Sequence, residues 1–266
     1  MVFKRMLSAF GAGGPSLVAF LATHRTQPGG TLSGEVRLMS GQFDAEIDQI
    51  GLGLLARVGA AQDGEQTGLT EFANAQISGP SVLRQGEERT IEFQVAVPWE
   101  TPISEIGGRH LAGMMLGVRT EVTVAMAVDK GSPDMIAVTP ARSQLRVLQA
   151  FAQLGFFFKS ASLRAGRLNG VHQDLPFYQG IEFYPPAHLA GAVHEVVLAF
   201  VLSSSGLNVV LEAGQHAGRL SSGDAAGCFQ MSHDEALHTD WSSEIDRWLA
   251  GLAHHARGGK RGHHQS

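Results

Sequence analysis

Histidine is the residue type in this 266-residue sequence whose number most suggests chemistry, because twelve are present. His233 and His238 lie five residues apart in SHDEALH, and two His-His pairs, at 254–255 and 263–264, follow near the C-terminus. Two ligands on one helix face need a spacing of four residues, and no Glu stands where a zinc-protease helix requires one. We therefore predict a solvated tail and no specific metal site.

The sequence evidence for other reactive residues is equally weak. Cys228 is the single cysteine, which excludes an internal disulfide and a cysteine-based zinc cluster. It stands between Gly227 and Phe229 in a strand-like segment, so we predict a buried, unreactive thiol. FGAGGPS and LSSSGLN lack the residues of a P-loop and of a serine-hydrolase elbow. We predict no catalytic residue and no cofactor, and an enzyme whose site is assembled only in space stays the alternative.

Charge and hydropathy narrow the function classes further. The sequence carries 25 acidic and 20 basic residues, a net charge of -5, which offers no overall attraction for nucleic acid. No run of about 18 apolar residues is present, so no membrane span is expected. Lys4 and Arg5 interrupt the apolar start of the chain, which therefore does not resemble a secretory signal. A cytoplasmic location is the expectation.

Two apolar clusters are the candidate interaction sites. The N-terminal stripe lies beside Lys4 and Arg5, a pattern that indicates docking onto the protein itself or contact with a membrane surface. The second cluster is a pair of tryptophans, a residue type favoured both in contacts within a chain and in interfaces between chains. The candidate interaction residues are Phe3, Met6, Leu7, Phe10, Trp241 and Trp248.

Alternation of apolar and polar residues predicts a β-sandwich over residues 1–140. In RTIEFQVAVP, for example, Phe93, Val95 and Val97 fall on one face, and Pro98 ends the strand beside Trp99, which we interpret as a packing residue. Similar alternation begins at residues 31, 49 and 117, with glycine-rich turns between the segments. No segment between them is long enough for a crossover helix, so the sheets are expected to be antiparallel.

The spacing of the apolar residues changes at the start of the second half. Residues 141–155 carry apolar residues near helical spacing and predict a short connecting helix. Residues 156–238 return to strand patterns and predict a second sandwich, with the apolar run 193–202 in the middle of a sheet. Residues 239–256 predict an amphipathic helix with Thr239 or Asp240 as its N-cap, and residues 257–266 a disordered basic, histidine-containing tail. The fold class is therefore all-β, with two tandem sandwiches.

Several segments in order resemble the bacterial sporulation-control proteins of stage zero, family M. They are MVFKRMLSAFGAGG, PGGTLSGEVRLMSG, FQVAVPWETPIS, VRTEVTVAMAVDKGSPDMIAVTP, LQAFAQLGF and LPFYQGIEFYP, spread over about residues 1–215. This resemblance implies an arrestin-like fold of two β-sandwich domains.

The resemblance also implies a non-enzymatic regulatory or adaptor protein of the cytoplasm that acts in sporulation through protein partners. Cell-division and cytoskeletal proteins are the partners that it suggests. No catalytic residues come with the family. Self-association through exposed strand edges, and membrane contact through the N-terminal stripe, are the remaining expectations.

Overall fold

The computed structural model describes residues 5–6, 14–59, 69–124, 127–130, 132–189, 193–214 and 226–258. Contacts divide the chain into two compact units. Unit 1 comprises Met1–Val58, Gln66–Glu105 and Met114–Thr139, and unit 2 comprises Gly59–Glu65, Ile106–Gly113 and Pro140–Ser266.

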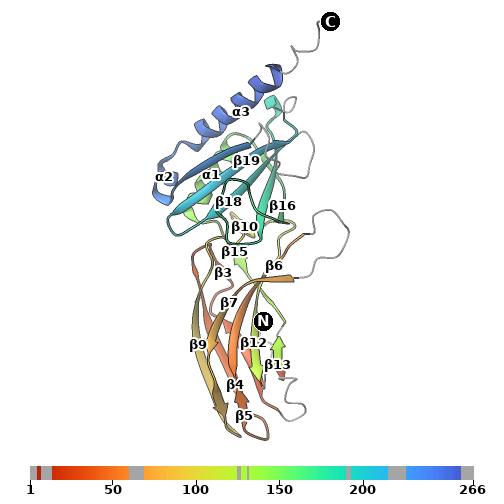
Figure 1. Ribbon diagram of the computed structural model, residues 1–266, viewed down its shortest axis with the longest axis vertical. Coiled ribbons are helices and arrows are strands. Elements are labelled where there is room, and N and C mark those ends of the chain that lie inside the picture. Colours follow the sequence, from red (N-terminus) through yellow and green to blue (C-terminus); the bar gives the residue numbers. More distant parts are fainter. Residues whose placement is uncertain are drawn as a thin grey trace. The chain divides into compact units, whose positions relative to one another are not determined.

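Unit 1 is built from two larger antiparallel sheets and small two-stranded ones (Figure 1). The first sheet has the order β1 (Arg5–Met6), β2 (Ser16–Leu21), β4 (Thr31–Met39) and β9 (Glu88–Ala96). The second has the order β13 (Ala127–Lys130), β12 (Leu116–Val124), β6 (Gln49–Arg57) and β7 (Leu69–Ser78), and β14 (Asp134–Met135) also pairs with β12. The small sheets pair β3 (Arg25–Thr26) with β15 (Ala137–Val138) and β5 (Ala45–Ile47) with β8 (Ser81–Leu83).

The core of unit 1 lies where the alternation predicts it. Leu32, Val36 and Leu38 of β4 are completely buried, while Arg37 between them is exposed. Phe93 and Val95 of β9 are buried in the same way. Each buried aliphatic side chain contributes roughly 1.5–3 kcal/mol, so burial of this face of the first sheet stabilises unit 1. Residues 117–128, which we predicted as one strand, form two strands in the structure. β12 ends at residue 124, and β13 folds back on it in antiparallel register.

Trp99 packs at the corner after β9, as we predicted. Its ring lies over Gly29, so that a Cβ at residue 29 would stand 2.5 Å from the indole. Gly29 also has a φ of +69°, a left-handed conformation that other residues rarely adopt. Glycine at this position therefore satisfies both the turn and the close approach of the ring.

Replacing Gly29 with alanine is expected to destabilise unit 1 by about 2 kcal/mol, because the new methyl group adds a clash to the backbone strain. Gly86→Ala is the matched control, since Gly86 has a φ of +76° but nothing within 4 Å of its missing Cβ. It should cost only about 1 kcal/mol, from strain alone. Urea denaturation of both variants measures the difference, and equal losses would contradict the clash.

Unit 2 contains one antiparallel sheet of five strands in sequence order. The strands are β16 (Phe157–Ala165), β17 (Phe177–Tyr184), β18 (Glu195–Leu202), β19 (Gly206–Gly214) and β20 (Ala226–Ser232). β18 is the central strand and is buried on both faces, which confirms the prediction from its unbroken apolar run. We expected two packed sheets here, but the described strands of this half form a single one. The two-stranded pair β10 (Glu105–Ile106) and β11 (Arg109–His110) precedes it in the chain.

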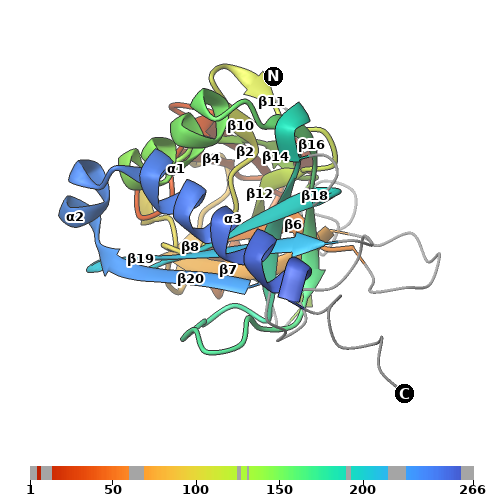
Figure 2. The same cartoon turned by 90° about the horizontal axis from the view of Figure 1, so that it is seen from above.

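Helices take the place of a second sheet against one face of this sheet (Figure 2). α1 (Arg142–Gln153) places Phe151 against Phe183 of β17, and α3 (Trp241–Gly258) places Trp241 against Phe229 of β20. The strand register puts Phe183 and Phe229 on the same face. On the opposite face, Leu168 packs against Ala199, Val201 and Val210. The all-β class with a C-terminal helix is confirmed, whereas the arrestin-like description stays a prediction.

The helix boundaries differ slightly from those predicted. α1 belongs to unit 2 and packs on its sheet, so it is more than a connector. α2 (His233–His238) lies at the end of residues 156–238, the range predicted for the second sandwich, because Ser232 and Glu235 form a capping box that starts a helix there. Asp240 accepts hydrogen bonds from the backbone and hydroxyl of Ser243, the role we predicted for it at the start of α3. α3 ends at Gly258, and the tail 259–266 lies outside the described residues. A 3-10 turn, η2, spans Ala187–Leu189.

Candidate interaction site

The N-terminal candidate residues are only partly described. Met6 belongs to β1, where its backbone pairs with Ser16 of β2, so this end of the stripe is joined to unit 1. Phe3, Leu7 and Phe10 lie outside the described residues. The choice between docking and membrane contact therefore stays a prediction.

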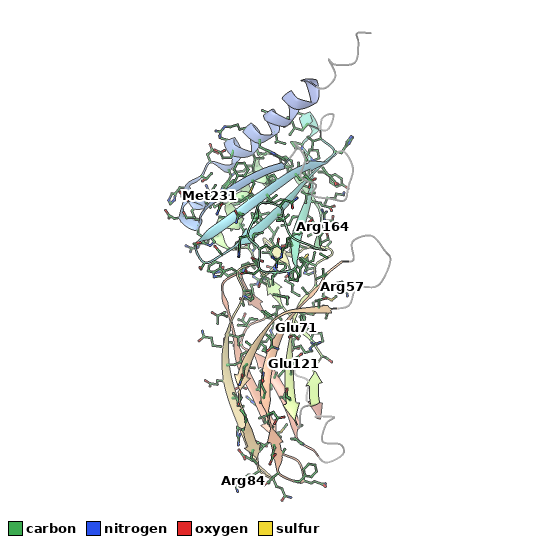
Figure 3. All side chains as sticks on the ribbon, viewed as in Figure 1. Arg57, Glu71, Arg84, Glu121, Arg164 and Met231 are labelled. Atoms are coloured by element: carbon green, nitrogen blue, oxygen red, sulfur yellow. The ribbon has the colours of Figure 1, made fainter. Side chains whose placement is uncertain are left out.

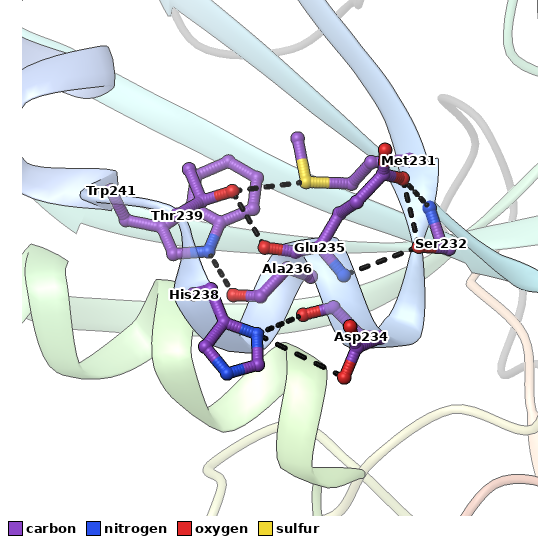
Figure 4. A network of polar contacts seen from close by, with 8 residues as sticks. All are labelled: Met231, Ser232, Asp234, Glu235, Ala236, His238, Thr239 and Trp241. Atoms are coloured by element: carbon purple, nitrogen blue, oxygen red, sulfur yellow. Dashed lines mark hydrogen bonds and ion pairs between the residues drawn. The ribbon is translucent and has the colours of Figure 1, made fainter.

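Trp241 lies inside unit 2 and is only 2% exposed. Its indole Nε1 donates a hydrogen bond to the Ala236 carbonyl at 2.8 Å (Figure 4). Its ring meets the Phe229 ring edge to face. Figure 4 also shows Thr239 donating to the Glu235 carbonyl, which closes the turn between α2 and α3. Of the two uses of tryptophan that the sequence left open, the structure places Trp241 in contacts within the chain.

Trp248 lies two turns further along α3 and is half-buried. Its ring covers Gly227 of β20, where a Cβ would stand 2.8 Å from the indole. Nε1 of Trp248 is buried and has no hydrogen-bond partner in the described part of the chain. Both tryptophans thus hold α3 on the sheet of unit 2. Met6 belongs to unit 1, so the described candidate residues fall in two different units.

Cys228 and His233 are the other candidate reactive residues, and the structure shows the contacts of each. Cys228 is exposed on β20, so our prediction of a buried thiol is wrong: alternation puts Gly227 and Phe229 under α3 and turns Cys228 to the other face. Partial burial still raises the pKa of its thiol, which disfavours the reactive thiolate. The ring nitrogens of His233 lie 2.8 Å from the Ser143 hydroxyl and 2.9 Å from the Ser203 carbonyl. Among the described residues, no group of three or more His, Cys, Asp or Glu side chains could hold a metal ion.

A pair of exposed aromatic residues stands at one end of the sheet of unit 2. Phe157 of β16 is 70% exposed and Tyr184 of β17 is 52% exposed. They are direct partners in the antiparallel register, so their side chains share one face. The next residue, Phe158, is 39% exposed and contacts Phe183, which in turn contacts the buried Phe151. We call Phe157 and Tyr184 the aromatic pair.

An ion network lies directly beside the aromatic pair. Nζ of Lys159 is 2.6 Å from the Glu195 carboxylate and 3.3 Å from that of Glu182. Arg164, labelled in Figure 3, reaches Glu182 at 2.7 Å, and the Ser160 hydroxyl donates to the same carboxylate at 2.7 Å. Nζ of Lys159 also stands 5.8 Å from the centre of the Tyr184 ring. These contacts fix the end of β16, where the register shifts by one residue between Phe158 and Ser160.

The network shifts the pKa values of its members in opposite directions. The hydrogen bond to Glu195 raises the pKa of the Lys159 ammonium, against the opposite effect of burial. Burial alone would raise the pKa of Glu182, but hydrogen bonds from Ser160 and Lys159 together hold it below its ordinary value. Both groups are therefore charged at neutral pH. The aromatic pair stands on a fixed, charged support, an arrangement suited to binding rather than to proton transfer.

Sequence reasoning missed this surface, although the sequence contains its signal. Phe156, Phe157 and Phe158 are consecutive, and side chains alternate along a strand, so three aromatic residues in a row cannot all face one core. Phe156 is buried while Phe157 is exposed, as this alternation requires.

Residues 3–217 match the family model described as SpoOM protein, which is more than half of the chain. The chain belongs to the Spo0M family. A search among curated proteins found no match. Spo0M proteins are sporulation-control proteins, which makes a regulatory role the one that the family supports.

Solved structures support the same fold. The crystal structure of Spo0M, a sporulation control protein from Bacillus subtilis, superimposes with a TM-score of 0.77 at 23% sequence identity. The match covers 90% of this Spo0M-family chain and 99% of that chain.

Two β-glucosidases match only in part. The enzyme from Listeria innocua, in complex with gluconolactone, has a TM-score of 0.29 at 17% identity and covers 48% of this chain and 16% of its own. The enzyme from Paenibacillus barengoltzii has a TM-score of 0.25 at 11% identity, with coverages of 64% and 18%. These scores are too low to support an inference about fold or activity.

No described helix is long and apolar enough to cross a membrane.

Proposed function

We propose that this chain is a non-enzymatic adaptor of the cytoplasm that regulates sporulation or cell division by binding other proteins. The observation that carries the proposal is the aromatic pair, Phe157 and Tyr184, exposed on a sheet whose neighbouring charges are all engaged with one another. Membership of the Spo0M family supports the regulatory part.

Exposed aromatic residues on a fixed support can bind a partner with little loss of conformational freedom. Tyrosine is enriched among the residues that dominate binding energy, because its large ring loses few rotamers on binding. Here the ring of Tyr184 is further held by Lys159, which Glu195 and Glu182 keep in place. A partner that covers the pair would bury two aromatic faces at a small entropic cost.

Affinity capture from a lysate of the native host tests the proposal. The tagged chain is compared with the double variant Phe157→Ser/Tyr184→Ser, and captured proteins are quantified by mass spectrometry. We expect at least one protein that the original chain enriches and the double variant loses by tenfold or more, since removing such contacts costs about 2 kcal/mol.

The control is the double variant Phe43→Ser/Val82→Ser, which removes two apolar side chains of unit 1 that are 42% and 48% exposed. It should capture the same proteins as the original chain. The adaptor proposal fails if the original chain enriches no protein over a mock capture. The role of the aromatic pair fails if both double variants capture as much as the original chain.

A further inference from the structure

The outer face of the first sheet of unit 1 carries a groove that the aromatic pair does not explain. The groove has a volume of about 680 Å³ and crosses β2, β4 and β9. Phe20, Ser33, Glu35, Glu92 and Gln94 line it. A second depression of about 330 Å³ continues along the same strands on the other side of Phe20, past Arg37. We call the first of these the sheet groove.

Two carboxylates of the sheet groove lie side by side on the neighbouring strands β4 and β9. Glu35 and Glu92 are direct partners in the β4–β9 register, a position in which Cβ atoms lie about 5 Å apart and like charges repel. Arg37 forms an ion pair with Glu35. Glu92 is exposed and makes no hydrogen bond or ion pair within the part of the chain that the structure describes. Glu92 is thus the carboxylate without a cation among the described residues, and a cation from outside the chain would relieve its repulsion by Glu35.

The rest of the groove is suited to a side chain with an apolar stem. Phe20 is half-buried beside the two carboxylates, and the guanidinium of Arg37 already lies 4.8 Å from its ring centre. This contact has the geometry in which an aromatic ring attracts a cation. Lysine and arginine both combine a cationic head with an apolar stem that packs along such a ring.

The dimensions favour a peptide over an ion or a small molecule. Three strands about 4.8 Å apart give a groove about 10 Å wide, which matches three residues of an extended chain. The groove is open to solvent, whereas small-molecule sites enclose most of their ligand. Its carboxylates repel phosphate, so nucleic acid is disfavoured.

We propose that the sheet groove binds an extended basic segment of a partner protein, with a Lys or Arg side chain between Glu35 and Glu92 and its stem against Phe20. This assignment deepens the proposed adaptor function, because it names the chemistry of one partner. It uses unit 1 and not the aromatic pair of unit 2, so either surface can fail without the other.

Fluorescence anisotropy with a labelled peptide of alternating Lys and Val tests the assignment, and the peptide of alternating Glu and Val is the sign control. We expect the Lys peptide to bind and Glu92→Gln to weaken its binding about tenfold. The control Glu46→Gln removes the same charge from an exposed position on β5 of unit 1 and should change binding less than twofold.

Several outcomes would overturn the assignment. Equal weakening by Glu92→Gln and Glu46→Gln would show attraction to the net negative charge alone. Equal binding of the Glu peptide would remove the role of the carboxylates. Loss of binding in the Phe157→Ser/Tyr184→Ser variant would place the peptide on the other unit. Circular dichroism of each variant verifies that the sheet is intact.

Discussion

Replacing Phe151 with alanine is expected to destabilise unit 2 by about 3–5 kcal/mol, the usual cost of deleting a fully buried aromatic side chain. Phe151 is completely buried, and its ring centre lies 4.8 Å from that of Phe156 and 4.7 Å from that of Phe183. The variant leaves a cavity between α1 and the sheet, and close packing limits how far the neighbouring rings can move to fill it.

Hydrogen exchange of the β17 and β18 amides at increasing guanidinium concentration measures this loss of stability. The exchange of these amides reports unit 2 separately from unit 1. Phe157→Ala is the matched control in the same unit, with the same side chain removed from a position that is 70% exposed. It should change stability by less than about 0.5 kcal/mol. A cost below about 1 kcal/mol for Phe151→Ala would mean that α1 does not form part of the core.

Replacing Lys159 with methionine is expected to cost unit 2 about 2–3 kcal/mol at neutral pH. The substitution keeps an apolar stem but leaves the carboxylate of Glu195, whose side chain is 8% exposed, without its cation. Lys159 itself is 26% exposed, so water screens the pair and the cost stays below that of a fully buried one.

The double variant Lys159→Met/Glu195→Gln separates the lost charge from the lost packing. It should recover part of the stability, since no uncompensated charge remains. Arg247→Met is the matched surface control, because Arg247 pairs with Glu244 at 2.7 Å but is 70% exposed. We expect it to cost less than about 0.5 kcal/mol. The buried-pair explanation is wrong if Lys159→Met costs no more than Arg247→Met.

The same network predicts how the stability of unit 2 depends on pH. The pKa of Glu182 is lowered on folding, so its stabilisation is complete above the ordinary value of 4.5 and is lost as the pH falls through the lowered value. The pKa of Lys159 is raised on folding, so its stabilisation is complete below 10.5 and is lost as the pH rises through the raised value. Both dependences should be weaker in the Lys159→Met variant, which denaturation at pH 3–5 and above 10 measures.

The local elements of the fold followed from residue order, because local patterns record which face of an element is buried. The period-2 alternation in β4 and β9 and the apolar run of β18 predicted their positions. Likewise, the helical spacing before Gly155 and the acceptor Asp240 predicted α1 and the start of α3. The family resemblance over about residues 1–215 is confirmed by the family-model match over residues 3–217.

The candidate sites were less predictable, because they depend on which strands become neighbours. Phe157 and Tyr184 are 27 positions apart in the chain, and Glu35 and Glu92 are 57 apart, so only the strand register makes each a facing pair. Nothing local in their sequence marks these partners. Trp241 shows the converse, since this residue type is common at interfaces but is buried here between α3, to which it belongs, and β20.

The sequence by itself determined the family, the β-rich class and the position of most strands and helices. Only the tertiary structure decided that one face of the second sheet is covered by α1 and α3, and which aromatic and acidic side chains stay exposed as pairs. The physical reason is that periodicity reports whether a residue is buried, whereas pairing across a sheet depends on contacts between residues far apart in the chain.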